Sequence, residues 1–182
     1  MQNKSESAEN VLYPQIASEL EEMVRIDQDV RQKEINDPEY WGGDIDKEHT
    51  EKLKGIIERI GWPTVSKVGK EASFSAWLLV QHADHDVIFQ EHCLDLMKQE
   101  PENEVSRHDV AYLEDRVRVN TGRPQLYGTQ FKPAKENRGK FVPQEIENAE
   151  QVEERRREMG LQSIAENTDE MYQKYNVPKP EN

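Results

Sequence analysis

Between Ala72 and Ala83 the chain runs through twelve residues without a formal charge, although charged residues recur every few positions elsewhere. Apolar residues fall on every side of a helix drawn through this stretch, which is typical of a helix buried all round. The stretch is too short, and too polar at its ends, to span a membrane, which needs about 20 apolar residues. We therefore predict a central core helix that opens near Gly69.

The rest of the composition limits the size of the core. Charged residues make up 34% of the 182 residues and hydrophobic residues another 34%, so the core must be compact and the periphery well solvated. This length suits one ordinary domain. We expect a mainly α fold, in which residues 11–182 form a single helical bundle behind a flexible segment 1–10.

The net charge of −13 comes from 24 basic and 37 acidic residues. Such a surface repels nucleic acids and anionic membranes, so we expect neither as a partner. A basic protein partner fits the charge better, and a small anionic ligand held by a local cationic group is the other candidate. The single cysteine, Cys93, and the absence of a signal-peptide pattern favour a cytoplasmic protein, with a removed leader as the alternative.

Further helices are predicted on both sides of the core helix from apolar spacing and capping residues. Ser106 with Asp109 matches a capping box. Residues 131–132 and 140–142 could pair as a small hairpin with its turn at 137–139. The expected helices cover residues 14–34, 47–60, 86–99, 106–122, 146–158 and 163–175.

Two aromatic segments connect these helices. Two glycines follow Tyr40 and Trp41, which predicts a loop pinned by aromatic packing. Trp62-Pro63 follows a helix-ending glycine and predicts a packed corner rather than a platform for a ligand. Cys93 has helical spacing with Phe89 and is interpreted as a core residue.

Common catalytic signatures are missing from the sequence, among them the phosphate-binding loop, the dinucleotide fingerprint, the zinc-protease motif and the nucleophile elbow. His82, His85 and His92, with Asp84 and Asp86 between them, raise the alternative of a metal site. Helical metal ligands usually lie three or four residues apart. His82 and His85 have this spacing but a break at Asp84 separates them, and His85 and His92 lie seven residues apart. We therefore predict no metal and no cofactor.

Polar residues at the ends of the apolar stretch are the first candidates for a site: Glu71, Gln81 and His82. Glu71 and His82 are eleven residues apart, so they face the same way at a separation of about 16 Å along a helix. They could line one groove, or each could hold a different neighbouring helix. Later in the chain come Asp115, Arg116, Gln125, Tyr127 and Gln130, and we expect this group to converge with His82 around a polar pocket.

Several short sequence motifs occur in a fixed order, and together they resemble the pattern of a bacterial family known as domain of unknown function 6624. The motifs are GWP at 61–63, EAS at 71–73, AW at 76–77, VQHAD at 80–84, FQ at 89–90, CL at 93–94, AYL at 111–113, DRV at 115–117 and YGTQ at 127–130. The resemblance is close over 61–130, and the ERR and GL segments at 154–161 look like the family's tail. It implies that His82, Asp115, Arg116, Gln125, Tyr127 and Gln130 belong to the family pattern, and that His85, His92 and His108 do not. It implies no activity.

Two classes of function remain. The first is a binding module for a small ligand or a protein, with a pocket formed by His82, Arg116 and the 127–130 loop. The second is an enzyme in which His82 is the general acid or base and Arg116 holds an anionic small molecule or a peptide. The sequence slightly favours the binding module, because no pair of nucleophile and base is visible.

Overall fold

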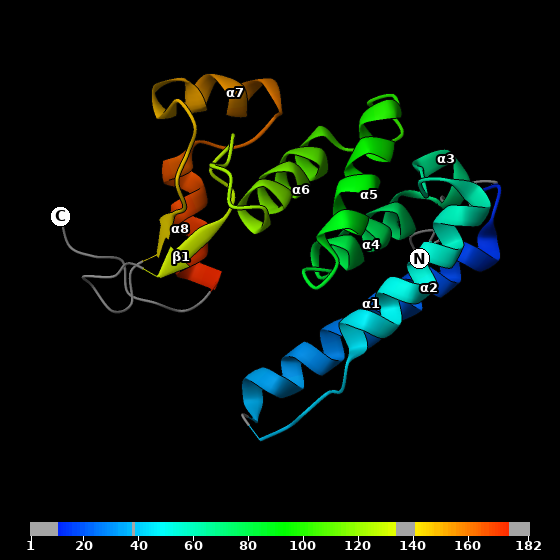
Figure 1. Ribbon diagram of the computed structural model, residues 1–182. Helices are drawn as coiled ribbons and strands as arrows, with labels where there is room; N and C mark the ends of the chain where they lie inside the picture. Colours follow the sequence, from blue (N-terminus) through cyan, green and yellow to red (C-terminus); the bar gives the residue numbers. More distant parts are fainter. Residues whose placement is uncertain (1–10, 38, 134–140, 175–182) are drawn as a thin grey trace, which may run out of the picture. The chain divides into compact units, whose positions relative to one another are not determined.

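The computed structural model describes residues 11–37, 39–133 and 141–174. The fold is mainly α with one small antiparallel hairpin, as predicted (Figure 1). The elements in chain order are α1 (Pro14–Asn36), α2 (Ile45–Ile60), α3 (Val65–Val68), α4 (Lys70–Gln81), α5 (Val87–Gln99), α6 (Arg107–Asn120), β1 (Phe131–Pro133), β2 (Phe141–Pro143), the 3₁₀ helix η1 (Ala149–Gln151), α7 (Val152–Glu158) and α8 (Ile164–Lys174).

These elements fall into two compact units, one ending at Val105 and the other beginning at Ser106. The expectation of one domain over residues 11–182 stays a prediction, and the expected flexible segment 1–10 lies outside the described residues. No helix in the described ranges is both long and apolar enough to cross a membrane.

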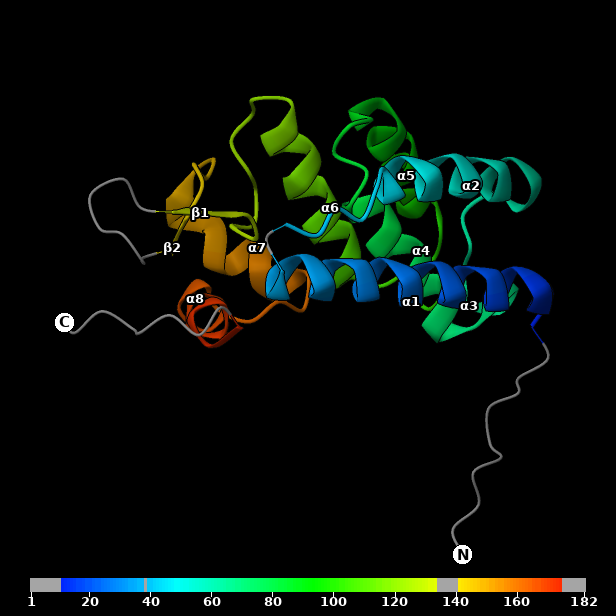
Figure 2. The same ribbon diagram turned by 90° about the horizontal axis from the view of Figure 1, so that it is seen from below.

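Helix α4 is the centre of the first unit, where it contacts α1, α2, α3 and α5. In Figure 2, α4 lies between α1 and α2. Ala72, Ala76 and Val80 are fully buried, because the chain lacks charge there and neighbours can close on several sides. The helix is not buried all round, however: Phe74 is 48% exposed and stacks at its edge against the buried Trp77.

Local signals set the ends of the helices that surround α4. The side chain of Asp86 accepts a hydrogen bond from Phe89 N at the start of α5. Gly61 ends α2 with a positive φ of 68°, a conformation that glycine adopts without steric cost. Trp62 is buried in the corner that follows, and Cys93 is buried in α5, both as predicted; burial raises the pKa of the Cys93 thiol.

The loop between α1 and α2 contradicts its prediction. Trp41 is 80% exposed and Tyr40 is also exposed, so aromatic packing does not pin this loop. Gly42 is the residue that touches α1, since a Cβ placed there would lie 2.2 Å from Val30 Cγ1. Only a residue without a side chain allows the backbone to approach that closely.

The second unit is built from α6, the hairpin, α7 and α8. Ser106 caps α6 through its hydroxyl, which accepts from Asp109 N, as the capping-box pattern predicts. In the hairpin Phe131 pairs with Pro143, and the predicted turn at 137–139 lies outside the described residues. The Tyr172 hydroxyl of α8 accepts from Phe141 N and packs this helix on β2.

One predicted helix is partly wrong. Residues 146–148 are not helical, because the backbone of this stretch is used for pairing instead: Gln125 N donates to Glu145 O, and Glu147 N donates to Gln125 O. Asn148 then adopts a left-handed conformation with a φ of 46°, and the helix starts only after it. Asparagine tolerates this conformation better than most residues.

Candidate functional site

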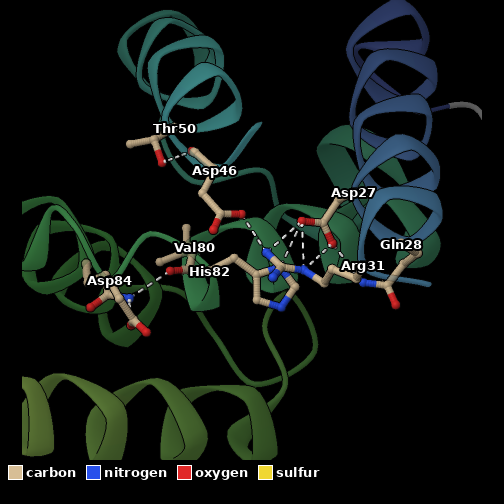
Figure 3. Close-up of polar contacts among 9 residues, drawn as sticks. Asp27, Gln28, Arg31, Asp46, Thr50, Val80, His82 and Asp84 are labelled. Carbon is tan, nitrogen blue, oxygen red and sulfur yellow. Dashed lines mark hydrogen bonds and ion pairs between the residues drawn. The ribbon is translucent and has the colours of Figure 1, made fainter. Parts of the chain in front are cut away.

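A fully buried carboxylate on α1 is the starting point of the first candidate site. Asp27 occupies a position on the face of α1 that otherwise carries Leu20, Met23 and Val30. A buried charge without partners would be strongly unfavourable, so its partners decide whether the helix can pack. Gln28 Nε2 donates to Asp27 Oδ2 at 2.7 Å, and the other partners are His82 and Arg31 (Figure 3).

His82 is the residue that ends α4. Its backbone N–H donates to Leu78 O and Leu79 O, and its ring Nδ1 lies 3.1 Å from Asp27 Oδ1. The side chain is 20% exposed, and its other ring nitrogen, Nε2, has no hydrogen-bond partner in the part of the chain that the structure describes. The ring is therefore held on one side and open on the other.

The turn after α4 is locked from α5, which fixes the backbone that carries His82. Gln90 is fully buried, and its side-chain amide donates to Val80 O at 3.0 Å and to Asp84 Oδ1 at 3.2 Å. Because this one amide group donates to two acceptors, it holds both sides of the turn. Gln90 is part of the FQ motif that carried the family resemblance, and the structure shows the contact that it makes.

Arg31 connects α1 to α2 through the same carboxylate. Its guanidinium donates to Asp27 Oδ1 from Nη2 at 3.0 Å and to Asp46 Oδ1 at 2.5 Å. The planar group with several donors suits two carboxylates at once. Asp46 lies in the first turn of α2, so the single side chain of Arg31 ties the start of that helix to the C-terminal part of α1.

The opposite charges of Asp27 and Arg31 stabilise each other's ionised form. Burial by itself would raise the pKa of Asp27, but the hydrogen bond from His82 and the Arg31 guanidinium outweigh burial, and the pKa of the carboxyl lies well below its ordinary value. Burial would lower the pKa of Arg31, and the two carboxylates reverse that effect and raise it. Asp27 and Arg31 are therefore both ionised at neutral pH.

The same residues supply possible metal ligands. Among the described residues, Asp27, Asp46 and His82 offer ligand atoms that all lie within 4.8 Å of one another. The Arg31 guanidinium donates to both carboxylates and thereby holds the position that a cation would take. The group includes neither His85 nor His92, both of which are exposed. The absence of a metal stays a prediction.

The second unit contains another fully buried carboxylate, Asp115 on α6. It accepts hydrogen bonds from Leu126 N at 2.6 Å, Tyr127 N at 3.0 Å and Thr129 N at 2.9 Å, and from the Thr129 hydroxyl at 3.0 Å. Burial outweighs these bonds, so the pKa of Asp115 is raised. The carboxylate holds the backbone of the 126–129 loop in place.

Gln125 and Gln130 close the same loop. Gln125 is fully buried, and its side-chain amide donates to Gln130 O and Gln144 O, both at 3.0 Å, while its side-chain oxygen accepts from Gln130 N at 2.8 Å. Arg116 Nη1 donates to Gln130 Oε1 at 3.4 Å. These contacts use the polar groups of the loop to hold the loop itself.

Two arginines of α7 bind the loop from the other side. Arg156 is almost completely buried and donates to Tyr127 O and to Gln162 O at 2.5 and 2.6 Å. Arg155 donates to Leu126 O at 2.8 Å. Burial lowers the pKa of Arg156. The ERR segment, which the sequence analysis linked only to the family's tail, thus anchors the 126–129 backbone.

The comparison with protein families agrees with the short motifs identified in the sequence. The model described as "Family of unknown function (DUF6624)" matches residues 14–177. The chain belongs to this family. No curated protein and no solved structure matches the chain. The family match covers α1 as well as the 61–130 region, so it includes Asp27, Arg31 and Asp46.

The structure places the predicted site residues of this DUF6624 protein in both units. Asp115, Arg116, Gln125, Tyr127 and Gln130 come together around the loop of the second unit. The others belong to α4 in the first unit: Glu71 is exposed in its first turn, Gln81 is buried in its last turn, and His82 ends it. Convergence of His82 with the loop residues stays a prediction.

Sequence reasoning missed Asp27, Arg31 and Asp46. A signal for Asp27 was present, because the apolar spacing of Leu20, Met23 and Val30 includes position 27 and an acidic residue there must be buried. Arg31, four residues later, was a further signal, since side chains at this spacing meet on a helix. Nothing local indicates Asp46 as their third partner, because α2 brings it close only through the tertiary fold.

Proposed function

We propose that this protein is an enzyme in which His82 transfers protons as a general acid and base, with Asp27 as the residue that positions it. One observation carries this proposal: a fully buried, ionised carboxylate holds Nδ1 of a ring whose Nε2 has no partner in the described part of the chain. The arrangement supplies a base and the group that orients it, as general-base catalysis requires.

The chemistry follows from the charges. Because Asp27 is ionised and accepts, Nδ1 must carry the proton, which leaves a lone pair on Nε2 of the neutral ring. Nε2 can then take a proton from a hydroxyl, a thiol or a water molecule. The imidazolium that forms is stabilised by the Asp27 carboxylate, and the proton can be returned to a leaving group.

Arg31 supports this reaction by keeping Asp27 charged and in place. Its guanidinium is engaged with two carboxylates, so we do not assign it the binding of an anionic substrate. Arg116 lies in the second unit, and anion binding by Arg116 is proposed there, with the second candidate below. A peptide is the other substrate class that the sequence indicates, and binding a peptide does not require an arginine at the His82 site.

A binding module is the second candidate, and the observation that favours it lies in the second unit. The hydroxyl of Tyr127 has no hydrogen-bond partner within the described ranges, and this half-buried side chain has a pKa raised by burial, so it remains a neutral donor. A small ligand that accepts from this hydroxyl and from Arg116 fits the loop. Tyr127→Phe would then weaken ligand binding without unfolding the protein.

Hydrolysis of three probes tests the enzyme: p-nitrophenyl acetate, p-nitrophenyl phosphate and the p-nitroanilide of a basic peptide. We expect turnover of at least one, reduced about 10²–10⁴-fold in His82→Gln and Asp27→Asn. His92→Gln is the matched control, because His92 is exposed on α5 and outside the site. Added imidazole should restore part of the activity of His82→Ala.

A second measurement needs no substrate. ¹⁵N NMR of the His82 ring, assigned by comparison with His82→Gln, should show Nδ1 protonated and Nε2 unprotonated in the neutral form. Asp27→Asn should allow both tautomers, because the amide can donate as well as accept. A ring protonated on Nε2 in the wild-type protein would contradict the proposal.

A further inference from the structure

Three large apolar side chains are exposed at the end of α1 and in the connection from α1 to α2. Ile35 is 75% exposed, Trp41 is 80% exposed, and Tyr40 is exposed between them in sequence; we call these three residues the lip. The other two tryptophans of the chain, Trp62 and Trp77, are buried. A single exposed tryptophan grouped with other large apolar residues marks a surface that contacts something else.

The lip lies beside the His82 site. Ile35 is one helical turn beyond Arg31 on the same helix. The backbone at Gly42, next to Trp41, touches Val30, which is adjacent to Arg31. In Figure 1 the connection runs back from the end of α1 to α2, where Asp46 binds Arg31. The lip is therefore connected to the part of α1 that carries Arg31, both along the helix and through Gly42.

The surroundings of the lip are acidic. Residues 29–48 contain seven acidic and three basic residues. Each basic residue is already paired: Arg31 with Asp27 and Asp46, Lys33 with Asp29, and Lys47 with Asp44. The acidic residues without a basic partner in this described stretch are Glu34, Asp37, Glu39 and Glu48. An uncompensated negative potential next to an aromatic surface favours a cationic ligand.

The lysine side chain of Lys33 already makes a cation–π contact with the lip. Lys33 Nζ lies 5.9 Å from the centre of the Tyr40 ring, within the range of a cation–π contact. Trp41 is a better acceptor for such a contact than tyrosine, and its larger exposed surface also favours an apolar group. A lysine or arginine next to an apolar residue supplies both groups.

We propose that the lip recognises a basic peptide segment, with an apolar side chain against Ile35 and Trp41 and a lysine or arginine over the Trp41 ring. The inference rests on the proposed function for one point only, namely that the bound segment is the substrate presented to His82. Peptide binding itself depends on the lip and on the acidic residues around it.

The test measures fluorescence anisotropy of a labelled, end-blocked hexapeptide Gly-Leu-Arg-Leu-Lys-Gly. A matched probe carries glutamate in place of arginine and lysine. We expect saturable binding of the basic probe, weakened at least tenfold by Trp41→Ala, weakened by added salt, and absent for the acidic probe. Ile88→Ala should bind like the wild type, because Ile88 is similarly exposed on α5 but outside the lip.

His82→Gln separates this inference from the proposed function. It should bind the basic probe normally. If it does so but the wild-type protein hydrolyses none of the three probes, peptide binding at the lip is retained and the enzyme proposal fails. Three results would each overturn the proposal that the lip binds a basic peptide: no binding of the basic probe, equal binding of both probes, or undiminished binding by Trp41→Ala. Concentration-dependent dimerisation abolished by Trp41→Ala would assign the lip to a second copy of the chain and also overturn the proposal. Circular dichroism of Trp41→Ala checks its fold, and Trp41→Phe should bind with intermediate affinity.

Discussion

Asp27 and Asp115 are both fully buried aspartates on helices, yet they have different kinds of partner. Asp115 accepts from three backbone N–H groups and one hydroxyl within a single loop. Asp27 accepts from the side chains of Gln28, Arg31 and His82, and His82 is 55 residues away in the chain. A carboxylate that binds backbone fixes a fold, whereas one that binds titratable side chains sets their charge and orientation.

The pKa values of the two carboxyl groups shift in opposite directions, in keeping with this difference in partners. The cationic partner Arg31 and the hydrogen bond from His82 overcome burial at Asp27 and lower its pKa, while the neutral partners of Asp115 do not overcome burial and its pKa is raised. Burial alone therefore does not distinguish a structural carboxylate from a functional one. The identity of the partner does.

The largest effect should follow the loss of Asp115. Asp115→Ala leaves three N–H groups and a hydroxyl without their acceptor, and we expect the free energy of unfolding to fall by about 3–5 kcal/mol. Urea denaturation measures the change, with the exposed Asp95→Ala as the control. Hydrolysis at His82, measured on the folded fraction, should not change. A decrease in the free energy of unfolding of less than about 1 kcal/mol would contradict the structural role of Asp115.

The second prediction concerns pH and sharpens the contrast between the two aspartates. The folded pKa of Asp27 lies below its unfolded value of about 3.9, so its stabilisation is full above that pH and is lost as the pH falls towards the folded pKa. Wild type should exceed Asp27→Asn in stability by about 1–3 kcal/mol at pH 7, and this difference should shrink below about pH 4.

Asp115 should show the opposite slope. Its folded pKa is raised, so the folded state holds its proton more tightly, and the contribution of the ionisable group to stability falls as the pH rises from about 3.9 through the folded pKa. Urea denaturation of wild type, Asp27→Asn and Asp115→Asn between pH 3 and pH 7 compares the slopes. Parallel slopes for the two variants would show that the partners do not set the charges.

The effects expected at two glycines of the first unit do not exceed the effect at Asp27. Gly55 lies inside α2 with open space around it, so Gly55→Ala should stabilise the protein by about 0.5–1 kcal/mol. Gly42→Ala should destabilise it by about 1–3 kcal/mol, because the new methyl group would overlap Val30. Thermal unfolding measures both, and stabilisation by Gly42→Ala would show that the lip is not held against α1.

Much of the helical fold follows from local sequence. The α1 and α5 helices begin and end within about three residues of their predictions, because apolar spacing, Asp86 and the prolines act over a few residues. The start of α7 was misplaced, because Glu145 and Glu147 form backbone hydrogen bonds with Gln125 and residues 146–148 do not form a helical turn. The exposure of Trp41 was also missed, since Gly42 rather than the tryptophan approaches Val30 of α1.

The sequence by itself determined that an uncharged helix lies at the centre of the first unit and that His82 ends it, because periodicity and charge act along the chain. It also marked Asp115, Gln125 and the YGTQ loop as belonging together. Only the tertiary structure decided that Asp27 holds Nδ1 of His82 and that Arg31 joins Asp27 to Asp46. The reason is physical: hydrogen bonds reach about 3 Å, and residues 27, 46 and 82 come within that range only when α1, α2 and α4 pack together.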